Sequence, residues 1–237
     1  MSLAPHGRGS RPAPPGRDDS VERVAWTRDE VRTFLEAAAT DRLGAIWRLA
    51  LATGLRRGEL LGITWDDVDE GSVTVRRQVL VRPAAPRRVY VRKTTKTRRT
   101  RKVRFDEATG AALRRWKAEQ AQARLMLGGA WKIHGGLGVE AEWVVTEADG
   151  GVIHPDTLTA RWRRLATAAG VRPIPLHSAR HSYAELALEA GVRLDVVSRQ
   201  LGHASIATTG NIYLHDSDEA AQEAAERVAA AIFPGGR

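Results

Sequence analysis

The chain has 237 residues, 43% of them hydrophobic and 27% charged, so it can form one large domain with a buried core and is not wholly disordered. It has no cysteine and no apolar run near the roughly 20 residues that span a bilayer, which excludes a disulfide scaffold, thiol catalysis and a membrane-spanning helix; a cytoplasmic protein is expected. The net charge is +9, and thirteen Lys and Arg with no Asp or Glu fall between Arg76 and Arg104, which indicates a polyanionic partner such as nucleic acid.

The first residues differ in composition from the rest of the chain. Residues 1–22 are rich in Gly, Pro, Arg and Ser and predict a disordered tail or an interdomain linker. Folded structure is expected over residues 23–237, beginning at a capping box formed by Thr27 and Glu30. Helices are predicted from apolar periodicity and end signals at about 27–38, 43–53, 57–61, 106–125, 155–169, 178–190, 195–201, 205–213 and 217–232.

Most strands are predicted in and around the basic segment, and Trp143-Val144-Val145 is predicted as a further short strand or extended segment. Apolar residues alternate with polar ones in and around the basic segment, which is the pattern of half-buried strands. The alternating pairs are Val73 and Val75, Val79 and Val81, Val89 and Val91, and Val103 with Phe105. We therefore expect an α+β protein that is mostly helical, with one small antiparallel β-sheet of about three strands carrying the basic residues.

Two stretches have the residue types of a phosphate-binding active site. In the first, Thr53-Gly54-Leu55-Arg56-Arg57-Gly58-Glu59-Leu60, Arg56 follows a helix-ending glycine and can point into a cleft, with Glu59 one turn later to orient it. A surface Arg–Glu pair on a short helix is the alternative for this stretch taken alone.

The second stretch lies near the other end of the chain. His177 and Arg180 are three residues apart and share a face of a helix. His181 follows directly, His203 comes after Gly202, and Tyr213 closes the set. One histidine or tyrosine alone is most often structural, but this combination is hard to explain as packing.

In these residues the chain resembles the tyrosine recombinase (phage integrase) family. The first stretch is similar to the family's T-G-L-R-x-x-E-L box, and the second to its H-x-x-R-H and L-G-H motifs followed by a tyrosine. The resemblance covers roughly Trp26 to Val228. It implies the tyrosine-recombinase catalytic-domain fold of DNA breaking–rejoining enzymes, and a site-specific recombinase or integrase that cuts and rejoins DNA through a 3′-phosphotyrosyl intermediate.

The resemblance also implies the role of each site residue. Two arginines would clamp the scissile phosphate, two histidines would hydrogen-bond it or assist proton transfer, and the tyrosine would be the nucleophile. The implied catalytic residues are Arg56, Lys96, His177, Arg180, His203 and Tyr213, supported by Glu59 and His181. The family places its lysine in a β-hairpin between the two boxes, which here runs from Val91 to Val103; Lys96 fits best and Lys93 is the alternative.

The basic hairpin is also the expected DNA contact. Its candidate DNA-binding residues are Arg92, Lys93, Arg98, Arg99, Arg101 and Lys102. The residue types fit phosphoryl transfer in their own right, because Arg presents a planar fork to two phosphate oxygens and a tyrosine of pKa about 10 needs a positive pocket to ionise. Two such clamps can stabilise the developing charge, so no cofactor and no metal are expected.

Two features of the chain leave alternatives open. The family's N-terminal core-binding domain is expected to be absent, so the chain is an excised catalytic domain, a truncated product or a minimal member. The predicted C-terminal helix would self-associate with a neighbouring protomer on double-stranded DNA, or pack on its own domain. A type IB topoisomerase-like activity and a non-catalytic DNA-binding remnant are the alternative functions.

Overall fold

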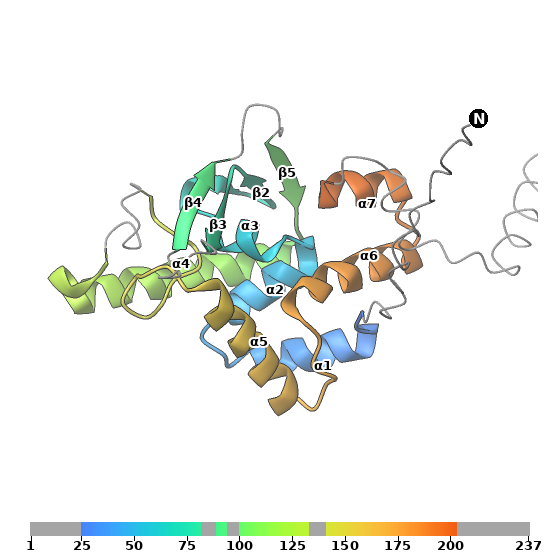
Figure 1. Ribbon diagram of the computed structural model, residues 1–237, viewed down its shortest axis with the longest axis horizontal. Helices are drawn as coiled ribbons and strands as arrows, with labels where there is room; N and C mark the ends of the chain where they lie inside the picture. Colours follow the sequence, from blue (N-terminus) through green and yellow to red (C-terminus); the bar gives the residue numbers. More distant parts are fainter. Residues whose placement is uncertain (1–24, 82–88, 94–99, 133–140, 203–237) are drawn as a thin grey trace, which may run out of the picture.

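Helices make up more than half of the residues that the structure describes, and the strands gather on one side of them, as Figure 1 shows for a computed structural model of the protein. The structure describes residues 25–81, 89–93, 100–132 and 141–202. The helices expected over 205–213 and 217–232 therefore lie outside the described residues, as does the predicted tail or linker over 1–22. No helix in the described ranges has both the length and the apolar character needed to cross a membrane.

The predicted helices of the described ranges are present. The α-helices are α1 (Arg28–Ala38), α2 (Gly44–Thr53), α3 (Arg57–Leu61), α4 (Glu107–Leu127), α5 (Pro155–Ala168), α6 (Ala179–Glu189) and α7 (Leu194–Leu201), and the short 3-10 turns are η1 (Trp65–Asp67), η2 (Gly128–Ala130) and η4 (Leu176–Ser178). Their ends follow local chemistry. The Thr27 and Glu30 side chains form the predicted capping box of α1, and Gly54 ends α2 with a left-handed φ of 61°.

An aromatic cluster joins the first helices to α5. The Trp26 and Trp162 rings stack with their centroids 4.8 Å apart, and Phe34 lies 4.4 Å from Trp162. Trp47 of α2 meets Trp162 edge-on, and all four rings are fully buried. Rings of this size supply much of the apolar area that a core removes from water. The cluster therefore fixes α1, α2 and α5 to one another.

The sheet arrangement differs from the one expected. The structure has two antiparallel sheets, not one of about three strands: β1 (Val68–Asp69), β2 (Ser72–Val75) and β5 (Arg101–Arg104) in one, and β3 (Arg77–Val81) with β4 (Val89–Lys93) in the other. The strands on either side of Lys96, β4 and β5, belong to different sheets and do not pair as the arms of a hairpin in the described register. Alternation predicts which face of a strand is buried, but it carries no information about the partner strand.

A buried carboxylate holds the chain where it passes from one sheet to the other. Asp67 is 1% exposed and accepts hydrogen bonds from Arg76 at 2.8 Å and Arg77 at 2.9 Å. The Thr64 amide and hydroxyl also donate to it. These bonds compensate a carboxylate that would otherwise be costly to bury. They fix the turn between β2 and β3 and thereby help to separate the two sheets.

Asp106 is expected to stabilise the protein as the N-cap of α4. Its carboxylate accepts from the Thr109 amide at 3.0 Å and from Arg48 at 3.1 Å. Burial works to raise its pKa, but the bonds from Thr109 and Arg48 outweigh this and lower the pKa to about 2. Asp106→Ala should lower the free energy of unfolding near neutral pH by about 1 kcal/mol, the usual value of an N-cap.

The pH dependence of that destabilisation checks its origin. Because the folded-state pKa is depressed, the stabilisation is complete above the ordinary pKa of 3.8 and is lost as the pH falls towards about 2. In urea titrations the difference between Asp106→Ala and wild type should therefore shrink in acid. Asp106→Asn, which keeps a capping oxygen, should be less destabilised. A stability difference between Asp106→Ala and wild type that stays constant as the pH falls to about 2 would contradict the role of the ionised Asp106 as the N-cap.

Candidate active site

Arg56 stands at the N-terminus of α3, directly after the turn that ends α2. The left-handed Gly54 reverses the chain, and Arg56 then has extended backbone (φ −66°, ψ 147°) as the cap of α3. Its side chain is 50% exposed and donates to Glu59 Oε1 at 3.2 Å. This agrees with the prediction that Glu59 orients Arg56. The guanidinium is held on one side and open to solvent on the other.

Glu59 is a buried carboxylate shared by two arginines. Its side chain is 9% exposed, and it accepts the Arg56 amide at 3.0 Å and a forked pair of bonds from Arg101 at 2.9 and 2.6 Å. Burial works to raise the pKa of Glu59, but the hydrogen bonds and charges of Arg101 and Arg56 lower it below its ordinary value. Glu59 therefore stays ionised near neutral pH and holds both guanidinium groups.

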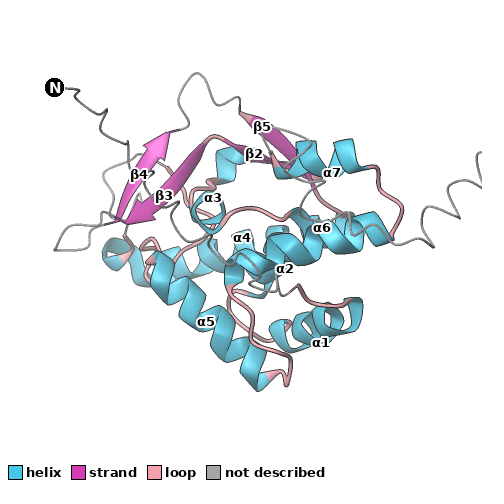
Figure 2. Cartoon of the chain, turned by 45° about the vertical axis from the view of Figure 1, so that its right-hand side comes forward, coloured by secondary structure: helices cyan, strands magenta, loops and turns pink. Residues whose placement is uncertain are grey.

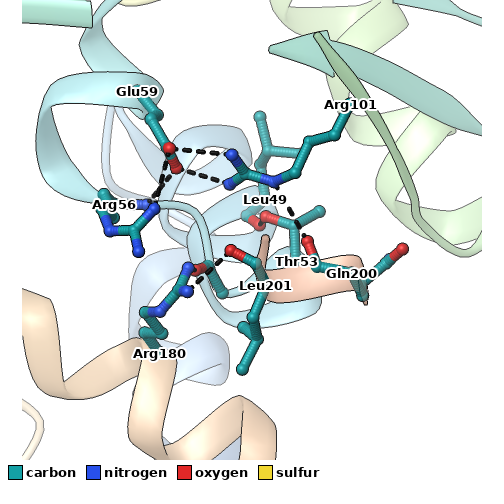
Figure 3. A network of polar contacts seen from close by, with 9 residues as sticks. Leu49, Thr53, Arg56, Glu59, Arg101, Arg180, Gln200 and Leu201 are labelled. Atoms are coloured by element: carbon teal, nitrogen blue, oxygen red, sulfur yellow. Dashed lines mark hydrogen bonds and ion pairs between the residues drawn. The ribbon is translucent and has the colours of Figure 1, made fainter. Parts of the chain in front are cut away.

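Arg180 ties three helices together at the same place. It lies on α6, is 8% exposed, and donates to the carbonyl oxygens of Gly54 at 2.9 Å and Leu201 at 2.6 Å. These carbonyls lie at the C-terminal ends of α2 and α7, where helices leave acceptors unsatisfied and carry partial negative charge. Arg56 and Arg180, far apart in the sequence, thus meet at the end of α2 (Figure 3).

Two of the predicted histidines lie beside Arg180. His177 is exposed in the η4 turn just before α6, so it is not on the regular helix that was expected to begin at residue 178. The His177 and His181 rings approach edge to face with centroids 6.4 Å apart. His177 therefore remains accessible at the surface next to the buried Arg180.

The other predicted site residues fall partly inside and partly outside the described ranges. Lys96, Arg98, Arg99, His203 and Tyr213 lie outside the described residues. The backbones of Arg92 and Lys93 belong to β4, opposite Gln78 and Arg77. Lys102 of β5, expected to bind DNA, pairs at 2.9 Å with Asp69 of β1, the strand on the other side of β2.

Gln200 is a residue of this region that the sequence motifs did not reveal. Its side-chain amide donates to the Arg104 carbonyl at 2.6 Å and accepts the Arg104 amide at 3.2 Å. It thus fills the open edge of β5 as a neighbouring strand would, and α7 and β5 lie side by side in Figures 1 and 2. A polar residue on a short amphipathic helix gives no sequence signal of such a contact.

Two glycines allow the close approach of α7. A Cβ on Gly54 would lie 2.6 Å from a Leu201 methyl carbon, and one on Gly202 would lie 2.7 Å from Arg101 Cδ. Both glycines also have positive φ, 61° and 68°, which disfavours any side chain. The C-terminal end of α2 is therefore packed tightly against Leu201 of α7, and the C-terminal end of α7 is packed tightly against Arg101.

Two arginines at one helix end, one of them half exposed, make a site that can bind an anion such as a phosphodiester. The family model of the phage integrase family matches residues 25–220. The chain therefore belongs to the phage integrase family, as the motifs indicated. The predicted fold class is confirmed by solved structures of the family's proteins.

Curated relatives extend beyond this chain. It is 31% identical over 212 residues to the tyrosine recombinase XerC-like protein of Caldanaerobacter subterraneus subsp. tengcongensis, covering 86% of this chain and 53% of that protein. It is 30% identical over 224 residues to tyrosine recombinase XerC of Mycobacterium tuberculosis, covering 89% of this chain and 61% of that protein. The chain thus spans less than two thirds of the length of these relatives.

Solved structures show the same fold. The integrase of the Tn1549 transposon, in complex with transposon right-end DNA, superposes with a TM-score of 0.76 at 22% identity over 90% of this chain and 69% of that one. XerA recombinase superposes with a TM-score of 0.61 at 26% identity, over 90% of this chain and 66% of that one. The catalytic domain of bacteriophage HP1 integrase gives 0.54 at 16% identity, over 90% of this chain and 99% of that domain.

Proposed function

We propose that this chain is the catalytic part of a site-specific DNA recombinase or integrase that cuts and rejoins DNA through a 3′-phosphotyrosyl link. The observation that carries the proposal is the convergence of Arg56 and Arg180 at the end of α2, with a buried glutamate holding Arg56. Such an arrangement presents fixed positive charge to the oxygens of a phosphodiester before the reaction begins. The names of its relatives favour a recombinase over a topoisomerase-like enzyme.

The reaction assigned to the site conserves the energy of the broken bond. The Tyr213 phenolate attacks phosphorus, the bond to the bridging 5′-oxygen breaks, and Lys96 gives that oxygen its proton. The product is a 3′-phosphotyrosyl link and a 5′-hydroxyl. A second 5′-hydroxyl then gives its proton to the neutral Lys96 and attacks the link, which returns the phenolate and reseals the strand. No nucleotide triphosphate is needed because one phosphoester replaces another.

The remaining predicted residues act on the phosphate. Arg56 and Arg180 bind its non-bridging oxygens, where negative charge grows in the transition state. His177 and His203 donate hydrogen bonds to it or assist proton transfer, with His181 in support. The partner is double-stranded DNA in the cytoplasm. This is supported by the DNA-bound structures of the Tn1549 integrase and of XerH recombinase with its difH substrate.

The test is to trap the covalent adduct. The chain is incubated with a nicked duplex carrying the DNA that flanks its gene, so that the short cleaved fragment diffuses away and the phosphotyrosyl link cannot be resealed. A shifted protein–DNA band that resists denaturation, with the DNA attached to Tyr213 by mass spectrometry, is the expected result. Binding without an adduct would identify a non-catalytic remnant. Relaxation of supercoiled plasmid lacking the site would favour the topoisomerase-like alternative.

Cleavage is expected to continue in excess EDTA. The positive charge that offsets the negative charge of the transition state is assigned to arginine and histidine side chains, which a chelator does not remove. The adduct yield measured with and without EDTA should be the same. A yield restored only by added Mg²⁺ would contradict this assignment of charge.

A further inference from the structure

Arg101 occupies a position that its place in the basic segment did not indicate. It begins β5, and its guanidinium turns inward to Glu59, with Nη1 donating to Oε1 at 2.9 Å and Nη2 to Oε2 at 2.6 Å (Figure 3). Its Nε donates to the Gln200 carbonyl at 3.3 Å. Each of its three nitrogens thus bonds to the protein itself, whereas a DNA contact would direct them outward.

Burial separates the two arginines that share Glu59. The Arg101 side chain is 18% exposed and that of Arg56 is 50% exposed. A DNA phosphate can therefore reach Arg56 far more readily than Arg101. Two cations on one carboxylate also leave a net positive charge, which a single Arg–Glu pair would not.

The geometry of the shared carboxylate explains how that charge stays available. Arg101 takes both oxygens of Glu59 as a fork, so Arg56 makes one longer side-chain bond of 3.2 Å to Oε1. Without Arg101, both oxygens would have acceptor positions free for the Arg56 guanidinium, beside the Arg56 amide that donates to Oε2. A bidentate pair would then neutralise the guanidinium charge. Bidentate Arg–carboxylate pairs are among the stronger polar interactions in proteins.

Arg101 also fixes the end of α7. Its Nε bond to Gln200 and its close approach to Gly202 lie one to three residues before His203. Gln200 in turn binds both backbone groups of Arg104. The same guanidinium therefore joins α3, β5 and α7.

We propose that Arg101 is a positioning residue with two tasks. It occupies both carboxylate oxygens of Glu59, so that Arg56 keeps an available positive charge, and it holds the C-terminal end of α7 in place beside Glu59. The inference rests on the proposed cleavage function. It removes Arg101 from the expected DNA-contact set and assigns it to the organisation of the active site.

The test compares single-turnover cleavage at saturating DNA with the salt dependence of binding. Arg101→Gln should slow adduct formation by about 10²-fold, the order expected when a catalytic group is misplaced. The slope of log K against log salt should stay unchanged, because the protein still neutralises the same number of phosphates. Arg98→Gln with Arg99→Gln should show the opposite signature and flatten the slope by about 0.9 for each phosphate that is no longer neutralised. Arg199→Gln on α7, an exposed arginine with the same charge change, should match wild type in both.

A double-mutant cycle with Glu59 isolates the mechanism. If Arg101 acts through Glu59, then Arg101→Gln combined with Glu59→Gln should be no slower than the slower single variant. Independent roles would multiply the two rate reductions, to about 10⁴-fold if each is about 10²-fold. Arg101→Lys keeps the charge without the fork and guards against misfolding. With an unchanged melting temperature, it should still cleave slowly.

Three outcomes would overturn the inference. They are a salt slope reduced by about 0.9 in Arg101→Gln at an unchanged cleavage rate, a wild-type rate in Arg101→Lys, and multiplicative rate reductions in the double variant. Failure of the proposed function looks different, because the wild-type chain itself would then form no adduct.

Discussion

Replacing Tyr213 with phenylalanine should abolish the covalent adduct while leaving DNA affinity nearly unchanged. The substitution removes only the phenolic oxygen that attacks phosphorus. Loss of the nucleophile typically slows an enzyme by about 10⁶-fold, so no adduct should be visible in the trapping assay. Binding measured by gel shift should persist, because phosphate binding is assigned to arginines and lysines.

The other tyrosines provide matched controls. The chain has three, and Tyr90 and Tyr183 lie in the described structure. Burial raises the pKa of Tyr183, which its hydrogen bond with Gln200 only partly offsets, so its phenolate is harder to form than usual. Tyr90→Phe and Tyr183→Phe should still form the adduct. An adduct that survives in Tyr213→Phe and disappears in either control would refute the assignment of the nucleophile.

Lys96→Ala should cleave ordinary DNA about 10²–10⁴-fold more slowly, the usual effect of removing a general acid. Without Lys96 the 5′-oxygen must leave as an unprotonated alkoxide. A substrate in which sulfur replaces the bridging 5′-oxygen has a leaving group that needs no proton. Cleavage of that substrate by Lys96→Ala should return to nearly the wild-type rate, measured as adduct formed over time.

Two comparison variants test whether rescue by the sulfur substrate is specific to loss of the general acid. Arg180→Ala should not be rescued, because it removes charge stabilisation and also the bonds that join the ends of α2 and α7. Lys93→Ala should behave nearly as wild type on both substrates. Rescue of Lys93→Ala together with normal cleavage by Lys96→Ala would instead place the general acid at Lys93.

Local signals in the sequence were sufficient for most helices and for part of the site. The capping box at Thr27, the helix-ending Gly54 and the N-cap Asp106 each act within one or two turns, so neighbouring residues determine them. Arg56 likewise caps the short helix that carries Glu59, three residues later. A motif that lies within one element can be read without knowledge of the fold.

The sequence by itself therefore determined the α+β class, the family and the pairing of Arg56 with Glu59. Only the tertiary structure decided that β5 pairs with β2, that Arg180 reaches the ends of α2 and α7, and that Arg101 turns inward to Glu59. A strand's alternation and an arginine's charge are properties of the residue and its neighbours. The partner of a strand or of a guanidinium is determined only when distant segments pack around one core, because a carboxylate buried there must be paired with cations.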